Sequence, residues 1–378
     1  MKDLLKYCDQ HLAETIALIE TLVRLESPST DKAAVDRCGA ALAGRLRAAG
    51  AEVDVLSRPE RGNHLLARIP GKGRPVMLLG HFDTVWPTGT LERMPLRRDG
   101  DVLRGPGTFD MKAGIALAVT ATEALRATGT AHPPITMLWT TDEEIGSATS
   151  RETIESEARQ SAAVLVLEPA LPDGSLKTAR KGCGEFELTV HGIAAHAGLD
   201  PGKGASAIHE LAAQIAAIER IQDLPRGISV NVGIVSGGSR PNVVAEEARA
   251  IVDVRAPTRD AASAVEAAFR RLQPVRPGTR LTVKGGFERP PMERAPAVVD
   301  LFRRACGVAS CLGRELGEGA AGGGSDGNFT AALGVPTLDG LGAIGDGAHA
   351  AHEHVDVTAL PWRAALIAGL LTSFRAST

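Results

Sequence analysis

The chain has 378 residues, 44% of them hydrophobic and 23% charged, and its 42 Lys and Arg are balanced by 45 Asp and Glu. The net charge of −3 removes the electrostatic argument for a nucleic-acid-binding protein, which usually carries a basic face. No apolar run approaches the ~20 residues that span a bilayer, and the first residues lack the apolar core of a signal peptide. We therefore expect a cytoplasmic protein of two domains, without membrane or nucleic-acid partners.

Five cysteines are scattered along the chain, at positions 8, 38, 183, 306 and 311. An odd number without paired spacing predicts no disulfide framework. Cys306 and Cys311 lie in a stretch with helical spacing, and we expect both to be buried structural thiols rather than metal ligands.

Apolar residues repeat with helical spacing over 3–24 and 31–49, which predicts two helices. Short apolar strands follow, with further helices between them. The predicted strands are 52–56, 63–69, 76–79, 135–139, 163–167 and 336–338, and the predicted helices are 111–127 and 151–159. This alternation favours an α/β domain whose sheet is covered by helices on both faces.

The segment from about 180 to 286 has a different order of elements. The predictions here are a strand at 184–191, a helix at 204–221, strands at 228–235 and 248–255, a helix at 260–272 and a strand at 279–284. This β-α-β-β-α-β order is the ferredoxin-like split pattern of an α+β domain. We therefore predict one domain formed by 1–179 and 287–378, with a smaller domain inserted over 180–286.

Acidic and imidazole side chains follow the predicted strands. The strand at 76–79 leads to His81 and Asp83, and alternation along the chain lets both side chains point the same way. Asp110 lies in a glycine-rich turn where a helix opens. Each residue has an ordinary alternative, a hydrogen-bonded His–Asp pair for the first two and a helix N-cap for Asp110.

The next two strands repeat this design. Glu143 and Glu144 follow one of them and Glu168 the other, while His349 lies in a glycine-rich loop after the last predicted strand. A run of acids is usually a solvated surface, but groups at the ends of several buried strands point to convergence at one edge of a sheet. Converging carboxylates repel one another unless a cation compensates, and imidazole with carboxylate favours zinc.

The chain resembles the di-zinc exopeptidase and amidohydrolase family of aminoacylase, acetylornithine deacetylase and succinyl-diaminopimelate desuccinylase. The motifs that carry the resemblance are GHFDTV (80–85), GPGTFDMKAG (105–114), TTDEEIGS (140–147), LEP (167–169) and His349. It extends over the inserted segment through GIAAHAG (192–198) and DVR (253–255). Within the family, GGGSD (322–326) and the Arg289-Pro290 dipeptide are most similar to glutamate carboxypeptidase.

The resemblance assigns roles to individual positions. The implied ligands of two zinc ions per subunit are His81 and Glu168 on one ion, Glu144 and His349 on the other, and Asp110 as a bridge. The resemblance also implies a cis peptide after Asp110 and an Asp83 that orients His81. His352 is the alternative to His349, and cobalt or manganese could substitute for zinc.

In the mechanism that the resemblance implies, Glu143 takes a proton from a water shared by the two ions and returns it to the leaving nitrogen. His196 would stabilise the oxyanion. It would come from the small domain of a second subunit, so the resemblance implies a homodimer formed through the inserted domain. The positions implied to bind the substrate are Arg255, Asn242, Arg289 and Gly324.

The implied activity is that of a glutamate carboxypeptidase type of metallopeptidase. Such an enzyme hydrolyses the amide bond to a C-terminal glutamate-like amino acid in a small peptide or an N-acyl amino acid. An N-acyl-amino-acid deacylase or dipeptidase of the same family is an alternative, and a catalytically inactive binding protein on the same fold is another. A dinucleotide enzyme is not favoured, because the GxGxxG match at 317–322 follows no persuasive strand.

Overall fold

The computed structural model of the chain describes residues 1–374 and contains two compact units. The large unit comprises Met1–Thr178, Arg294–Ala321 and the chain from Ser325 onward. The small unit comprises Ala179–Glu293 and Gly322–Gly324. Within 1–374, no helix is both long and apolar enough to cross a membrane.

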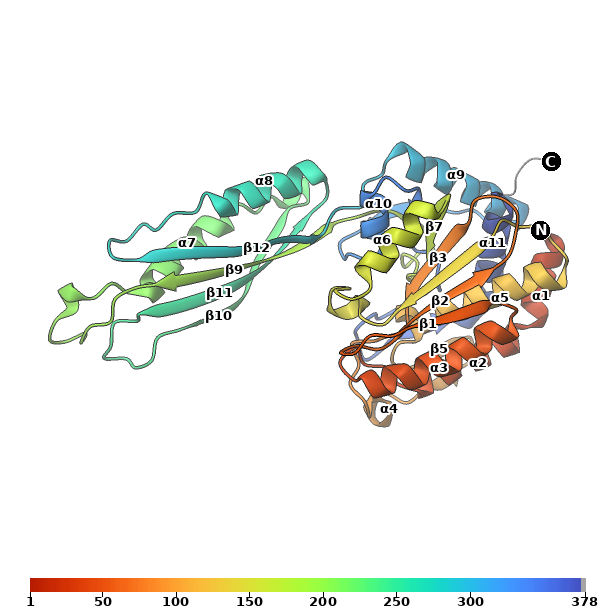
Figure 1. Cartoon of the computed structure of the whole chain (residues 1–378), viewed down its shortest axis with the longest axis horizontal. Helices are drawn as coiled ribbons and strands as arrows, with labels where there is room; N and C mark the ends of the chain where they lie inside the picture. The colour runs from red at the N-terminus through yellow and green to blue at the C-terminus, as the bar shows by residue number, and fades with distance from the viewer. Residues whose placement is uncertain (375–378) are drawn as a thin grey trace. The chain divides into compact units, whose positions relative to one another are not determined.

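A six-stranded sheet forms the centre of the large unit (Figure 1), in the order β1-β2-β6-β3-β7-β14. Its strands are β1 (Glu52–Leu56), β2 (His64–Ile69), β3 (Val76–His81), β6 (Ile135–Thr140), β7 (Ala163–Val166) and β14 (Thr337–Leu338). The last four are parallel, whereas β1 and β2 are antiparallel to their neighbours. The predicted mixed α/β fold is therefore confirmed.

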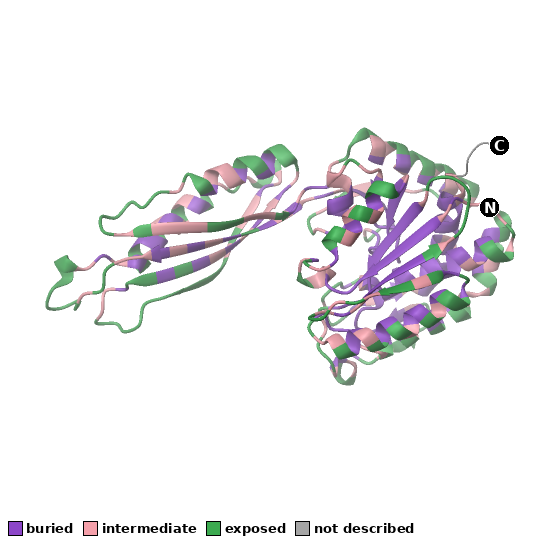
Figure 2. Ribbon diagram, in the orientation of Figure 1, coloured by how far each residue is buried: buried purple, intermediate pink, exposed green. Residues whose placement is uncertain are grey.

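Helices cover both faces of this sheet. Because alternate residues of its strands point to opposite faces, each face has a core of its own. Val76 and Leu78 belong to one core, whereas Met77 and Leu79 belong to a second core. The helices of the first core are α1 (Lys2–Gln10), α2 (Leu12–Arg24), α3 (Lys32–Ala48), α5 (Ala113–Ala127), α9 (Pro296–Cys311) and α11 (Leu360–Thr372). Those of the second are α6 (Arg151–Gln160) and α10 (Gly327–Ala332). The central strands are buried along their whole length (Figure 2).

Two further sheets consist of very short strands. One has the order β15-β16-β5-β4, and the other pairs β13 with β8. Their strands are β4 (Arg97–Asp99), β5 (Val102–Arg104), β8 (Leu176–Arg180), β13 (Glu318–Ala321), β15 (Gly345–Asp346) and β16 (His354–Asp356). The sequence analysis predicted none of these six strands, because each has few apolar residues in its two to five positions and so shows no clear apolar run or alternation. Because β13 occupies the GxGxxG match, that segment does not form a phosphate-binding turn ahead of a helix.

Two expectations from the sequence are wrong in detail. The helix expected over 3–24 is divided into α1 and α2 at His11, whose ring stacks on that of Tyr7. Cys306 is half-buried and Cys311 is exposed, so neither is a buried structural thiol. Both lie off the core-facing stripe of α9, which consists of Val298, Leu301, Ala305 and Ala309.

The small unit has the predicted β-α-β-β-α-β order of elements. These are β9 (Gly182–His191), α7 (Ala207–Glu219), β10 (Ser229–Gly237), β11 (Glu247–Ala256), α8 (Arg259–Arg270) and β12 (Arg280–Arg289). The sheet order is β10-β11-β9-β12, and α7 and α8 pack on one face of it (Figure 1). The edge strand β10 keeps Ile234 and Val235 exposed, at 59% and 56%.

Glu210 of α7 anchors the loop that leads into β12. Its side chain is fully buried. The carboxylate accepts hydrogen bonds from the backbone N–H of Val275 (3.1 Å) and Arg276 (2.8 Å) and from Gln214 Nε2 (2.6 Å). A buried carboxylate is tolerated here because protein donors occupy its oxygens.

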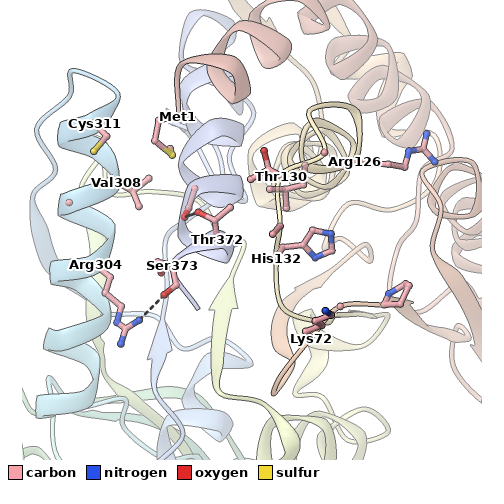
Figure 3. Close-up of a pocket in the computed structure, with 17 residues that line it drawn as sticks. Met1, Lys72, Arg126, Thr130, His132, Arg304, Val308, Cys311, Thr372 and Ser373 are labelled. Carbon is pink, nitrogen blue, oxygen red and sulfur yellow. Dashed lines mark hydrogen bonds between the residues drawn. The ribbon is translucent and has the colours of Figure 1, made fainter. Parts of the chain in front are cut away.

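A cavity of about 1440 Å³ opens on the large unit (Figure 3). Its walls include 71–72 and 130–132, which precede β3 and β6, so it lies by the amino ends of the parallel strands. Arg304 also lines it and donates a hydrogen bond to the carbonyl oxygen of Ser373 (3.1 Å). None of the predicted site residues lines this cavity.

Glu210→Gln should destabilise the small unit by about 1–3 kcal/mol at neutral pH, because an acceptor oxygen is replaced by a donor that faces N–H groups. Although burial acts to raise it, hydrogen bonds from Gln214, Val275 and Arg276 hold the pKa of Glu210 below its usual 4.5. The carboxylate therefore contributes stability above that value, and the contribution is lost as the pH falls through the lower folded-state pKa. Urea unfolding at neutral and acidic pH would measure this.

Glu219→Gln, at the exposed end of the same helix, is the matched control and should change stability little. An equal loss of stability for Glu210→Gln at neutral and acidic pH would contradict the expected role of the charge.

Candidate metal centre

Three parallel strands lead to acidic or imidazole residues at one edge of the large sheet. β3 ends at His81, β6 leads into the turn Glu143–Ile145, and β7 is followed by Glu168. Because β3 pairs in register with both β6 and β7, their carboxyl ends lie side by side. The fold therefore brings His81, Glu143, Glu144 and Glu168 into one group.

His81 lies at the centre of this group and is 1% exposed. Its Nε2 lies 3.3 Å from Asp110 Oδ1 and 3.5 Å from Glu168 Oε1. On the other side of the ring, Nδ1 lies 3.1 Å from the backbone carbonyl oxygen of Asp83 and 3.4 Å from its carboxylate Oδ1. A proton on Nδ1 directed at Asp83 leaves the lone pair of Nε2 facing the carboxylates, which is the form that binds a metal ion.

Asp110 lies in an irregular turn, Thr108–Lys112, ahead of α5. The N-cap alternative is wrong, because α5 begins at Ala113 and no side chain caps it. Instead, Oδ1 faces His81 and Oδ2 lies 3.4 Å from His349 Nε2. The peptide bond after Asp110 is cis. A carboxylate whose two oxygens face two imidazoles has the arrangement of a bridge between two ions.

His349 reaches the same group from the loop between β15 and β16. β16 pairs antiparallel with β5 in the short-stranded sheet β15-β16-β5-β4 of the large unit. The loop that precedes β16 and the loop that follows β5 therefore lie at the same end of that sheet. His349 Nε2 lies 3.1 Å from Glu144 Oε2, and the residue has a φ of 60°, in the left-handed region. The alternative residue, His352, instead faces Asp346 at 3.7 Å.

Several buried polar atoms of this group have no hydrogen-bond partner among residues 1–374, including His81 Nε2, Asp110 Oδ1 and Glu144 Oε1. Two sets of three ligand atoms, each within 4.8 Å of one another, share His81. One set adds Glu143 and Glu168, and the other adds Asp110 and Glu144. Unpaired buried nitrogen and carboxylate oxygen are costly unless a cation is bound. The donors suit zinc, and the residues fit two adjacent metal ions.

The charged groups of the site shift one another's pKa. Burial acts to lower the pKa of His81, but the surrounding carboxylates, Asp110 first, raise it well above its usual value. Hydrogen bonding to Asp110 and Glu144 raises the pKa of His349 to about 10. Burial raises the pKa of Glu144, whereas the two imidazoles hold that of Asp110 below its usual value against the effect of burial.

Ser29 is a site residue that the sequence analysis missed. It is buried, and its Oγ donates a hydrogen bond to Asp83 Oδ2 (2.7 Å). Although burial acts to raise it, hydrogen bonds from His81 and Ser29 keep the pKa of Asp83 below its usual value. In the sequence, Ser29 belongs to a Ser-Pro-Ser helix stop, and nothing local links it to a residue more than fifty positions away.

In the small unit, His196 lies in an exposed loop. Its Nδ1 accepts hydrogen bonds from the backbone N–H of Gly198 and Leu199, both at 3.1 Å. A ring nitrogen that accepts carries no proton, so the neutral ring has its proton on Nε2, which is left as a donor. Asn242 is exposed beside this loop, and its carbonyl oxygen accepts a hydrogen bond from Ala197 N–H (3.0 Å).

Arg255 forms an ion pair with Asp253 within the small unit. Its guanidinium donates two hydrogen bonds to the carboxylate of Asp253 (3.0 and 2.7 Å), and Nη1 lies 2.5 Å from Cys183 Sγ. Arg289, which is 7% exposed, pairs with Cys183 from the opposite side of β9. Both predicted substrate arginines therefore flank one position of β9, and the fork of Arg255 is engaged by Asp253.

Gly324, the remaining predicted substrate contact, belongs to the short segment Gly322–Gly324 of the small unit. Arg180 is 4% exposed and donates hydrogen bonds to the carbonyl oxygens of Gly323 and Gly324, each at 3.1 Å. The Arg180 guanidinium thus holds the glycine segment by its backbone.

Comparison with known proteins places this chain in a family. Residues 77–373 match the family described as peptidase family M20/M25/M40. The chain is 30% identical over 365 residues to carboxypeptidase G2 of Pseudomonas sp. (strain RS-16), which covers 94% of this chain and 88% of the relative. It is 32% identical over 352 residues to a succinyl-diaminopimelate desuccinylase of Stenotrophomonas maltophilia (strain K279a), covering 86% and 91%.

Among solved structures, the YXEP protein of Bacillus subtilis, a dinuclear metal binding peptidase from the M20 family, is similar with a TM-score of 0.69. The similarity covers 97% of this chain and 98% of that one at 15% identity, so it bears on the fold. The resemblance inferred from the motifs is confirmed. The chain belongs to peptidase family M20/M25/M40, the family of metallopeptidases and amidohydrolases that cleave amide bonds.

Proposed function

We propose that the chain is a di-zinc exopeptidase of the glutamate carboxypeptidase type, which removes a C-terminal glutamate-like residue from a small peptide or an N-acyl amino acid. The observation that carries this proposal is the group of imidazoles and carboxylates at the sheet edge, with buried nitrogen and oxygen atoms that lack hydrogen-bond partners among the described residues. The identity with carboxypeptidase G2 supports a C-terminal amino acid as the leaving group.

Five residues would hold the two zinc ions. These are His81 and Glu168 on one ion, Glu144 and His349 on the other, and Asp110 between them. The approaches of His81 to Glu168 (3.5 Å) and of His349 to Glu144 (3.1 Å) support this division. When bound, the ions polarise the scissile carbonyl and lower the pKa of water.

Glu143 is the proposed general base. It is half-buried next to the ligand Glu144, and its carboxylate lies within 4.8 Å of the ligand atoms of His81 and Glu168. A carboxylate at this place can accept a proton from the attacking water and return it to the leaving nitrogen. Asp83 acts through His81 as a positioning residue, because it fixes the ring with Nε2 toward the carboxylates.

Glu143→Gln should lower kcat by roughly 10²–10⁴-fold while two zinc ions per subunit are retained, because the substitution removes a proton acceptor and not a ligand. Hydrolysis assays and elemental analysis of the purified protein would measure both quantities. Glu144→Gln, one residue further along the same turn, is the matched variant and should lose zinc as well as activity. Equal loss of zinc in the two variants would reject the assigned roles.

The small unit would supply contacts to the substrate. The Nε2–H of His196 is proposed to donate a hydrogen bond to the oxyanion that develops on the scissile carbonyl. Following the family resemblance, we propose that this histidine serves the site of a second subunit, in a homodimer formed through the small unit. The exposed Ile234 and Val235 on the edge strand β10 support an interface there.

The cytoplasmic location stays a prediction.

A mixture of His196→Ala and Glu143→Gln subunits should recover activity that neither variant has alone. In a mixed dimer, the subunit with an intact Glu143 receives an intact His196 from its partner. Statistical exchange of subunits would restore about one quarter of the wild-type activity, since half of the dimers are mixed and each has one competent site. Activity measured after mixing and re-equilibration tests this, and the absence of recovery despite subunit exchange would reject the shared site.

Recognition of the leaving amino acid would rest on the two arginines. A guanidinium matches a carboxylate with two parallel hydrogen bonds. We propose Arg255 and Arg289, which flank the same position of β9, as the carboxylate contacts, with Asn242 and Gly324 completing the site. An N-acyl-amino-acid deacylase with another amino-acid preference is a second candidate, supported by the 32% identity with a succinyl-diaminopimelate desuccinylase.

Among N-acyl and peptidyl substrates ending in Glu, Asp, Ala or Leu, the highest kcat/KM is expected for Glu. Arg289→Met should raise KM for that substrate by roughly 10–100-fold with a smaller change in kcat, because a charge-assisted pair to the bound carboxylate is lost. Arg280→Met, at the exposed start of the same strand, is the control. A preference for Leu or Ala, or an unchanged KM in Arg289→Met, would favour the deacylase or dipeptidase alternative.

A further inference from the structure

Glu353 is a fully buried carboxylate that none of the proposed metal roles uses. It accepts four hydrogen bonds. Oε1 accepts from the backbone N–H of Phe109 (2.9 Å) and Asp110 (3.0 Å), and Oε2 accepts from the backbone N–H of Gly107 (2.9 Å) and from Trp86 Nε1 (2.8 Å). An ionised carboxylate offers about four acceptor sites, so protein donors saturate this one.

These bonds join the two loops that carry Asp110 and His349 to the loop that follows the ligand His81. Trp86 belongs to the loop after β3, which follows His81, and Gly107 belongs to the loop after β5, which carries Asp110. Glu353 itself closes the loop that carries His349. Its backbone adds to the connection, because its carbonyl oxygen accepts a hydrogen bond from the N–H of residue 105 (3.2 Å). One residue therefore ties together the loops that bring ligands from distant parts of the chain.

We propose that Glu353 is a positioning residue that holds Asp110 and His349 in place for the two metal ions before the ions bind, without binding an ion itself. The inference rests on the proposed di-zinc function. Its basis is the contrast between two kinds of buried carboxylate. Asp110 and Glu144 each have an oxygen without a hydrogen-bond partner among the described residues, whereas both oxygens of Glu353 are occupied.

Glu353→Gln tests this with little change in volume. The amide replaces one acceptor oxygen by an NH₂ donor. Whichever oxygen is replaced, two of the four hydrogen bonds are lost and two donors then face a donor. We expect Co²⁺ to bind Glu353→Gln about 10–100-fold more weakly than the wild type. We also expect the visible absorption of bound Co²⁺ to change, since Asp110 is displaced.

Glu26→Gln is the matched control. Glu26 also accepts backbone hydrogen bonds in the large unit, from Gly89 N–H (2.9 Å) and Leu91 N–H (3.1 Å), but these bonds reach neither the Asp110 loop nor the His349 loop. Its Co²⁺ affinity should stay within about threefold of the wild type, and its Co²⁺ spectrum should be unchanged. A general loss of stability, by contrast, would affect both variants alike.

A second measurement needs no metal. In the metal-free protein, Glu353→Gln should speed the hydrogen exchange of the amides of Gly107, Phe109 and Asp110 by roughly tenfold or more. Amides elsewhere in the large unit should exchange at the wild-type rate. If Glu353→Gln does not fold, Trp86→Phe removes only one donor to the same carboxylate. It should weaken Co²⁺ binding by about two- to tenfold.

The outcomes separate this inference from the function on which it rests. A wild-type protein that binds two Co²⁺ ions, with unchanged affinity, spectrum and amide exchange in Glu353→Gln or in its substitute Trp86→Phe, would overturn the positioning role alone. A wild-type protein that binds no Co²⁺ would overturn the proposed function and the inference together.

Discussion

The parallel pairing of β3 with β6 and β7 is the constraint on which the candidate metal centre depends. The register places Leu79 opposite Leu138 on one side and Val166 on the other, so the three strands end at nearly the same level. The first polar residues beyond those ends must then share a small volume. Both faces of the strands are buried, and a register shift would move apolar side chains out of their cores. Hydrophobic packing therefore fixes where the charged groups meet.

Two pairs of carboxylates in this protein differ in their hydrogen bonds. Glu210 and Glu353 are held by backbone or side-chain donors, so their charge is compensated by the fold. Asp110 and Glu144 face imidazoles and keep oxygens that no donor reaches among the described residues. Uncompensated charge of the second kind destabilises a fold unless something binds there.

In the small unit, a neighbouring acid on the same strand binds one of the two arginines that were predicted to contact the substrate. An arginine at the end of a strand suits a substrate carboxylate, yet Asp253 lies two residues before Arg255 on β11 and therefore on the same face. The resulting ion pair with its two hydrogen bonds engages the guanidinium within the unit. Arg289 lies across β9 from it and pairs with the same position of that strand.

The sequence by itself determined the strands of the six-stranded sheet and of the small-unit sheet, the order of elements in the small unit, and the residues that follow the strand ends, because apolar runs and residue spacing are local signals. The family resemblance implied that His349 and Asp110 share a site, but only the tertiary structure decided how the two loops meet, since the strands β5 and β16 that align them are three residues each. The tertiary structure alone also placed Ser29 beside Asp83 and Glu353 beside Trp86. These contacts join residues that are far apart in the chain, and hydrogen bonds between distant residues leave no periodic pattern in the sequence.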